Sequence, residues 1–180
     1  MGCADSTPAV GGNTAGGGRG RCALARWPVL GLTVNDNGYS SLILGDLATG
    51  QTVRPTPALP RGTYSIRFAP RAPVLSVRVG GPQVPGDVWT LDARSGQTRR
   101  ATRSATGGLD PSRFVVPEAH SFRSWDGETV HGLLYLPHAL PGGAKPPVLL
   151  GVHGGPTSQA RPTYIAHYQY CCRAGSPSST

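Results

Sequence analysis

From Trp27 onward, short apolar or alternating runs are separated by clusters of turn residues. Val29–Val34 is apolar and rich in β-branched side chains, which favours a strand. Asn35–Gly38 follows as a turn cluster, in which the Asn-Gly pair supplies the positive φ that a tight hairpin requires. Tyr39–Leu47 then reads as the returning strand. The pattern predicts β-hairpins in this part of the chain, with almost no helix.

The same pattern of short strands separated by turn residues continues to about residue 102. Thr63–Phe68 and Val74–Val79 alternate apolar with polar side chains, as strands with one buried face do. Shorter strands are predicted at Gln51–Arg54, Val88–Asp92 and Gln97–Thr102.

A repeat is visible in the residues themselves. Asp46-Leu47-Ala48-Thr49-Gly50-Gln51-Thr52 matches Asp92-Ala93-Arg94-Ser95-Gly96-Gln97-Thr98, 46 positions later. A period of this length with about four short strands per unit is typical of β-propeller blades, whose small sheets bury their faces only against neighbouring blades. A plain antiparallel sandwich with one accidental turn match is the alternative.

The pattern changes after a Gly-rich boundary at 107–113. Glu118–Ser124 and Thr129–Leu136 are predicted to form a hairpin around Trp125-Asp126-Gly127. Pro147–Val152 is apolar without alternation, which predicts burial on both faces as a central parallel strand.

That run leads into His153-Gly154-Gly155-Pro156. A Gly-Gly loop after a central strand lets backbone N–H groups approach a ligand closely, because no Cβ intervenes. In α/β-hydrolases such a loop supplies one donor of the oxyanion hole. A simple Gly-Gly turn is the alternative for the motif taken alone.

Taken together and in this order, these segments resemble the prolyl oligopeptidase family of serine peptidases, in its acylaminoacyl-peptidase and dipeptidyl-aminopeptidase-like branch. The resemblance runs from about Leu30 to Tyr170. It is carried by the two blade turns, by Pro117-Glu118, by Ser121–Gly127, by His131–Pro137 and by Val148–Pro156.

The resemblance implies a mostly β fold: the last blades of a β-propeller followed by the first strands of an α/β-hydrolase domain, both incomplete. Residues 26–112 would hold about two blades and residues 113–170 the start of the peptidase domain. The backbone N–H of Gly155 would serve the oxyanion, with Gly154 and His153 shaping the loop. Short peptides would be the substrates of the full-length parent, and no cofactor is implied.

No G-x-S-x-G motif occurs in the sequence, so the nucleophile elbow is missing, together with the Asp and His that follow it in the family. His153 is an unsuitable base, because it precedes the position where the nucleophile belongs. None of the triad is therefore present, and the chain alone is predicted to be inactive. The alternative is a noncatalytic β-rich module that binds a peptide or protein through a sheet edge.

Residues 171–180 lose all periodicity, and a frameshift near residue 170 is one hypothesis for them. Residues 1–25 are mostly Gly, Ala and small polar residues, which predicts disorder because they bury too little apolar area.

Charge and cysteine content change the picture little. The net charge is +8, but the Arg residues are scattered and no nucleic-acid-binding motif accompanies them, so no nucleic-acid partner is expected. The four Cys and five His residues lack metal-ligand spacing, and no metal is expected. No apolar run is long enough for a membrane span and residues 1–25 do not resemble a secretory signal, so a cytoplasmic protein is expected.

Overall fold

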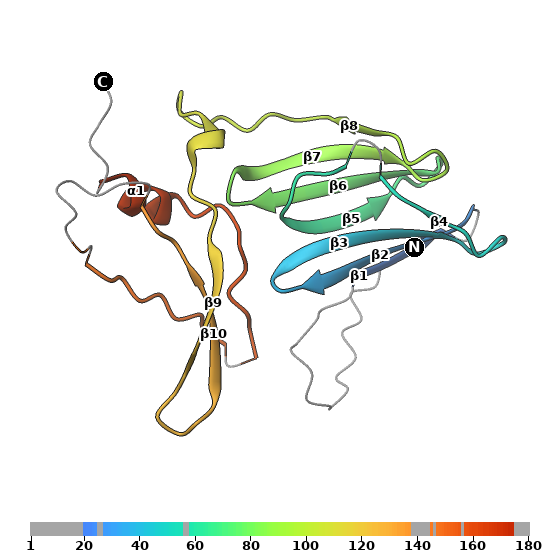
Figure 1. Cartoon of the computed structure of the whole chain (residues 1–180). Coiled ribbons are helices and arrows are strands. Elements are labelled where there is room, and N and C mark those ends of the chain that lie inside the picture. Colours follow the sequence, from blue (N-terminus) through green and yellow to red (C-terminus); the bar gives the residue numbers. More distant parts are fainter. Residues whose placement is uncertain are drawn as a thin grey trace.

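The computed structural model describes residues 20–24, 27–55, 58–137, 145, 147–155 and 157–174 (Figure 1). The fold is mostly β. Two four-stranded antiparallel sheets, which we call the first and second blades, lie against each other, and a hairpin and one helix form a second unit beside them.

The first blade has its four strands in the order β1-β2-β3-β4, each antiparallel to its neighbour. The predicted hairpin around Asn37 and Gly38 joins β2 to β3, and Asn35 stabilises it by accepting the Gly38 N–H at 2.9 Å. The strands are β1 (Gly20–Leu24), β2 (Trp27–Asp36), β3 (Tyr39–Asp46) and β4 (Thr52–Val53).

One prediction is wrong here. Residues 20–24, which we expected to be disordered with the rest of 1–25, form β1. The composition of this stretch offers little apolar area of its own, but β2 provides an edge with which its backbone pairs. Residues 1–19 and 25 lie outside the described residues.

The second blade repeats the arrangement in the order β5-β6-β7-β8. The predicted strand Thr63–Phe68 has those same bounds in the structure, because its strict alternation leaves only one register that buries the apolar side chains. The strands are β5 (Thr63–Phe68), β6 (Val74–Gly81), β7 (Val84–Asp92) and β8 (Thr98–Arg100).

The two turns that revealed the repeat have the same hydrogen bonds. Asp46 Oδ1 accepts the N–H groups of the residues two and three positions later, at 2.8 and 3.2 Å, and Asp92 Oδ1 does so at 2.9 and 2.8 Å. In both turns the Asp carbonyl accepts the N–H of the glycine, Gly50 or Gly96, which has a φ above +70°. The sequence repeat is therefore a structural repeat.

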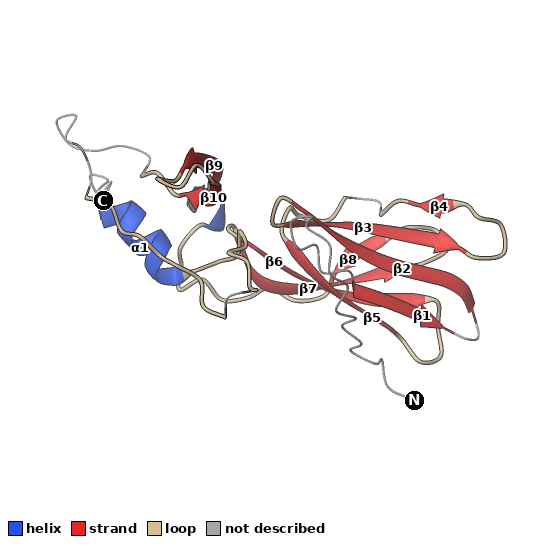
Figure 2. Ribbon diagram, turned by 90° about the horizontal axis from the view of Figure 1, so that it is seen from below, coloured by secondary structure: helices blue, strands red, loops and turns tan. Residues whose placement is uncertain are grey.

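The core lies between the blades (Figure 2). At Gly31 in β2, an added Cβ would meet Ile66 Cδ1 at 3.0 Å and Leu75 Cδ2 at 3.3 Å, so this glycine lets the two sheets approach. The buried apolar residues of the cluster are Val29, Leu44, Leu75, Val77, Val79, Trp89, Leu91 and Ala93.

A buried carboxylate fastens the chain as it leaves the second blade. Asp87 in β7 is 0% exposed and pairs with Arg100. Its Oδ1 accepts the Thr102 hydroxyl at 3.0 Å and the Ser104 N–H at 2.7 Å. Burial by itself raises the pKa of Asp87, but the hydrogen bonds from Arg100, Thr102 and Ser104 outweigh it, so the pKa lies below its ordinary value.

The second unit begins with a short 3-10 helix at Pro111–Arg113. The hairpin of β9 (Glu118–Arg123) and β10 (Thr129–Leu134) follows, and α1 (Ala166–Ala174) closes the described chain. Trp125-Asp126-Gly127 forms the predicted turn, in which the Gly127 N–H donates to the Ser124 carbonyl at 3.0 Å.

The prediction that Pro147–Val152 forms a central parallel strand is wrong for this chain. None of its residues lies in a strand, and Val148 is 92% exposed. An unbroken apolar run indicates that both faces of a strand would be buried. A strand also needs backbone hydrogen-bond partners along its two edges, and the run itself does not supply them. No strand among the described residues pairs with this segment.

The chain end also differs from expectation. α1 continues through Cys171 and Cys172 to Ala174, so residues 171–174, predicted to be aperiodic, are helical. Cys172 is buried, so this part of the helix packs against the rest of the fold. Residues 175–180 lie outside the described residues.

Candidate active site

The loop predicted to hold the oxyanion lies between the unpaired run and α1. His153, Gly154 and Gly155 are all exposed, and Pro156 lies outside the described residues. Gly155 has a φ of +60°, a left-handed conformation that costs a residue with a Cβ about 1–2 kcal/mol. An added Cβ at Gly154 or Gly155 would meet nothing within 4 Å, so the space around the loop is open.

Two contacts shape this loop. The Gly155 carbonyl accepts the Ser158 N–H at 2.6 Å, which closes a tight turn after the second glycine. His153 Nδ1 lies 3.3 Å from the Gly154 carbonyl, so the imidazole folds back onto its own loop. Because its carbonyl is used in the turn, the backbone of Gly155 is held in place by a contact within the loop.

A strap that we define as residues 157–165 connects the loop to α1 and lies against the first blade. Arg161 in this strap donates from Nε to the Gly38 carbonyl at 2.9 Å and from an Nη to Ser40 Oγ at 3.2 Å. Gln159 accepts a hydrogen bond from the Asn35 side-chain amide at 2.6 Å. Burial lowers the pKa of Arg161. The strap thus ties the glycine loop to the β2–β3 turn of the propeller.

A cluster of three phenol rings lies between the first blade and α1. We call Tyr39, Tyr135 and Tyr168 the phenol cluster. Tyr135 after β10 packs edge-on against Tyr168 of α1, with ring centroids 5.3 Å apart. The Tyr135 and Tyr39 hydroxyls are buried without a hydrogen-bond partner among the described residues. Burial first, and then the neighbouring Tyr39, Tyr168 and Cys172, raise the pKa of Tyr135 to about 12.

The phenol cluster also contacts the run before the loop. The Tyr168 hydroxyl lies where a Cβ at Gly151 would stand, so a side chain at that position would collide with it. α1 is thus in direct contact with the segment that leads into His153.

The structure brings His153, Gly154 and Gly155 together in one loop, as the motif requires. The other histidines lie apart from them: His120 and His131 on the hairpin, His167 in α1, and His138 outside the described residues. The described residues contain no group of three or more His, Cys, Asp or Glu side chains placed to hold a metal ion. Among all the residues that the structure describes, no helix is long and apolar enough to cross a membrane.

Sequence reasoning did not find the residues that position the site. Arg161 and the phenol cluster are brought to their partners by the tertiary fold, and no spacing in the sequence signals them. Only Asn35-Asp36-Asn37-Gly38, recognisable as a turn, marks the place where Arg161 and Gln159 attach.

Comparison with known proteins gives partial matches. The sequence matches no family model. A stretch of 46 residues, 26% of this chain, is 46% identical to dipeptidyl peptidase 8 of Mus musculus and of Homo sapiens and covers 5% of each of those proteins.

Many solved structures superpose on this chain, and three of them illustrate the likeness. A crystal structure of puromycin hydrolase does so with a TM-score of 0.71 and 23% identity, over 86% of this chain and 23% of its own. A puromycin-hydrolyzing peptidase of Mycobacterium tuberculosis gives 0.66 and 21% identity, over 86% of this chain and 24% of its own. One of two prolyl endopeptidases studied together gives a TM-score of 0.72 and 15% identity, over 91% of this chain and 24% of its own.

The chain spans about a quarter of the length of these solved structures, and a smaller share of the curated relatives. At these identities the superpositions establish the fold. They confirm a mostly β chain that combines part of a propeller with part of a hydrolase unit.

Proposed function

We propose that this chain belongs to the prolyl oligopeptidase family, whose fold it shares, and that it is a piece of a serine peptidase acting on short peptides. Within the family we favour the acylaminoacyl- or dipeptidyl-peptidase-like branch. The observation that carries this assignment is the left-handed Gly155, φ +60°, in the His-Gly-Gly loop that the strap 157–165 attaches to the propeller.

In this proposal the Gly155 N–H donates to the oxyanion of the tetrahedral intermediate. The negative charge develops only as the carbonyl is attacked, so a donor held in place beforehand lowers the barrier rather than improving substrate binding. The turn closed by Ser158 fixes the backbone of Gly155. Gly154 and His153 shape the loop, and no cofactor takes part.

We further propose that these 180 residues alone are inactive. The sequence lacks a G-x-S-x-G elbow, so there is no serine for an acyl-enzyme to form on. A fluorophosphonate probe, which reacts with activated serines, should leave the purified chain unlabelled. Labelling at any serine would contradict this part of the proposal. We also place the parent protein in the cytoplasm, which cell fractionation would check.

The role of Gly155 is tested in a chimera. Residues 113–174 would replace the matching segment of a puromycin-hydrolyzing peptidase, which supplies the nucleophile and the rest of its domain. Activity is expected to persist. Gly155→Ala keeps the backbone N–H but strains the φ of +60° that aims it. If the N–H turns away from the oxyanion, kcat should fall by up to about 10²–10³-fold, the loss for one oxyanion donor, with little change in KM.

Gly154→Ala is the matched control. Gly154 lacks a left-handed φ and its added Cβ would meet nothing within 4 Å, so alanine should be tolerated. Equal losses of kcat from the two substitutions, or a change in KM alone, would show that the Gly155 N–H does not donate to the oxyanion.

One observation favours a second candidate, a noncatalytic module that binds a peptide or protein. Leu149 and Leu150 in the unpaired run are 69% and 82% exposed, and an extended apolar segment can add to the sheet edge of a partner. An inactive chimera, together with tight binding of the 180-residue chain to an extended peptide, would favour this reading over the peptidase.

A further inference from the structure

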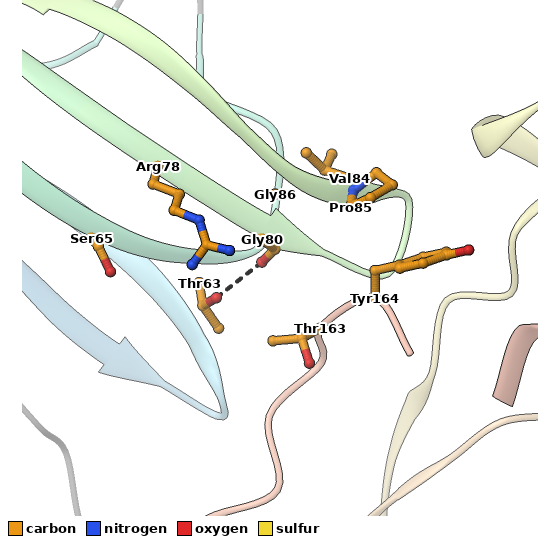
Figure 3. Close-up of a pocket in the computed structure, with 9 residues that line it drawn as sticks. All are labelled: Thr63, Ser65, Arg78, Gly80, Val84, Pro85, Gly86, Thr163 and Tyr164. Carbon is orange, nitrogen blue, oxygen red and sulfur yellow. Dashed lines mark hydrogen bonds between the residues drawn. The ribbon is translucent and has the colours of Figure 1, made fainter. Parts of the chain in front are cut away.

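A small pocket lies where the second blade meets the strap, apart from the glycine loop (Figure 3). Its volume is about 150 Å³, and it is lined by strands β5, β6 and β7 on one side and by Thr163 and Tyr164 on the other. Sites that enclose a whole drug-sized ligand run to roughly 300–1,000 Å³. This pocket has room for a single functional group at the end of a larger molecule.

The cation of the pocket is Arg78. Alternation along β6 buries Leu75, Val77 and Val79 against the first blade and turns Arg78 to the opposite, outer face of the sheet. Within the described residues Arg78 makes no ion pair, because the buried Asp87 of the adjoining strand faces the core and pairs with Arg100. The charge of Arg78 is therefore left for a ligand or for water.

Space for the guanidinium is provided by Gly86. An added Cβ at Gly86 would lie 3.2 Å from an Nη of Arg78, tighter than a normal contact. The guanidinium thus lies over bare backbone at the pocket wall, where its planar fork of N–H donors can meet a planar acceptor.

Hydroxyl groups complete the lining. The Thr63 hydroxyl donates to the Gly80 carbonyl at 3.0 Å, so its proton is already committed. Ser65, opposite Arg78 in the neighbouring strand, and Thr163 from the strap carry hydroxyls that can rotate to donate into the pocket. The pocket therefore offers one positive charge and two further donors, with no carboxylate in its lining.

The charge balance selects the ligand. One guanidinium neutralises one negative charge, which suits a carboxylate better than a phosphate dianion. We propose that this pocket binds the carboxylate of a peptide through a bidentate pair with Arg78, supported by Ser65 and Thr163. The peptide as the source of the carboxylate rests on the proposed function.

The test measures binding to the 180-residue chain and needs no catalysis. The Nε–H resonance of Arg78 would be followed by NMR while acetyl-Gly-Gly or its C-terminal amide is added. The acid should bind saturably and at least about tenfold more tightly than the amide, as the loss of a charge-assisted hydrogen bond implies. Equal binding of acid and amide, or no binding of either, would overturn the proposal.

Variants separate the pocket from general charge. Arg78→Gln should weaken binding of the acid at least about tenfold. Arg99→Gln removes the same charge from an exposed position beside Thr90 on the same outer face, outside the pocket lining, and should leave the affinity unchanged. Equal losses from the two would reduce the effect to the net charge of the face. Thermal melts of both variants confirm folding, and Ser65→Ala gives a second, milder probe of the pocket.

Further ligands identify the source. Acetyl-Glu-amide carries only a side-chain carboxylate, and stronger binding of acetyl-Gly-Gly would assign the pocket to a peptide C-terminus, whereas the reverse would assign it to acidic side chains. Inorganic phosphate binding more tightly than either would contradict the carboxylate. Because the chimera assay depends on Gly155 and this assay on Arg78, failure of one leaves the other proposal intact.

Discussion

The side-chain amide of Gln169 in α1 satisfies both backbone groups of Val115, 54 residues earlier in the chain. The Val115 N–H donates to Oε1 at 2.7 Å, and Nε2 donates to the Val115 carbonyl at 2.9 Å. Gln169 is 3% exposed. A helix that follows the glycine loop is thereby fastened to the segment that leaves the propeller.

Gln169→Leu should therefore destabilise the docking of α1. It leaves a buried N–H and a buried carbonyl without partners, at a cost of about 1–3 kcal/mol in the free energy of unfolding. Gln169→Glu keeps the acceptor for the Val115 N–H but sets a buried carboxylate oxygen against the Val115 carbonyl, so at neutral pH the loss should be at least as large as for Gln169→Leu, and it should shrink in acid, where the protonated carboxyl can donate. Chemical denaturation would measure both. Tyr170→Ala, on the exposed side of the same helix, is the control. Similar losses at the two positions would argue against the Gln169 contact.

The buried Asp87 should make the second blade sensitive to acid. Its pKa is lowered in the folded state, so its stabilisation is present above the unfolded pKa of about 3.9 and is lost as the pH falls through the folded value. Asp87→Asn should cost about 1–3 kcal/mol at pH 7 and flatten the decline of stability below pH 4. Urea denaturation across pH 2–7 would measure it. The exposed Asp36→Asn should leave the curve unchanged, and an Asp87→Asn curve parallel to that of the wild type would exclude the proposed linkage.

The close approach of the two blades depends on Gly31. Gly31→Val adds three carbons where one already meets Ile66 Cδ1 at 3.0 Å, so overpacking of about 1–3 kcal/mol is expected. Gly45→Val in β3 is the matched control, because an added Cβ there meets nothing within 4 Å. Thermal unfolding should show a lower Tm for the first variant only. A Tm for Gly31→Val at or above that of the wild type would mean that the sheets can separate at no cost.

The repeated turns should respond alike to the same change. Asp46→Ala and Asp92→Ala each remove two side-chain hydrogen bonds to backbone N–H groups, and we expect each to cost about 1 kcal/mol or more. Asp92→Ala should cost slightly more, since Asp92 also accepts the Ser95 hydroxyl at 3.0 Å. Denaturant titration measures both. A negligible cost at one turn and a large one at the other would argue that the two units are not equivalent.

The sequence predicted the blades well because their evidence is local. Alternation in Thr63–Phe68 and the shared turn residues at Asp46 and Asp92 depend only on neighbours in the chain, and the structure has strands and turns where they indicate. The same patterning missed β1, whose partner edge belongs to another segment.

The candidate site was predicted less completely. The His153–Gly155 loop was recognised by motif, whereas Arg161 and Gln169 acquire their roles only when the fold brings them to Gly38 and Val115. The predicted strand Pro147–Val152 depended on partners at both edges, which its own residues cannot specify.

One measurement tests the central claim that residues 113–174 begin a hydrolase sheet whose strand at Pro147–Val152 pairs with strands outside these 180 residues. It is amide hydrogen exchange at Leu149–Val152, compared between the 180-residue chain and an active chimera that supplies the rest of the domain. The account predicts fast exchange in the chain alone and exchange slowed by several orders of magnitude in the chimera, as pairing at both edges requires. Fast exchange in both proteins, with the chimera still active, would contradict it.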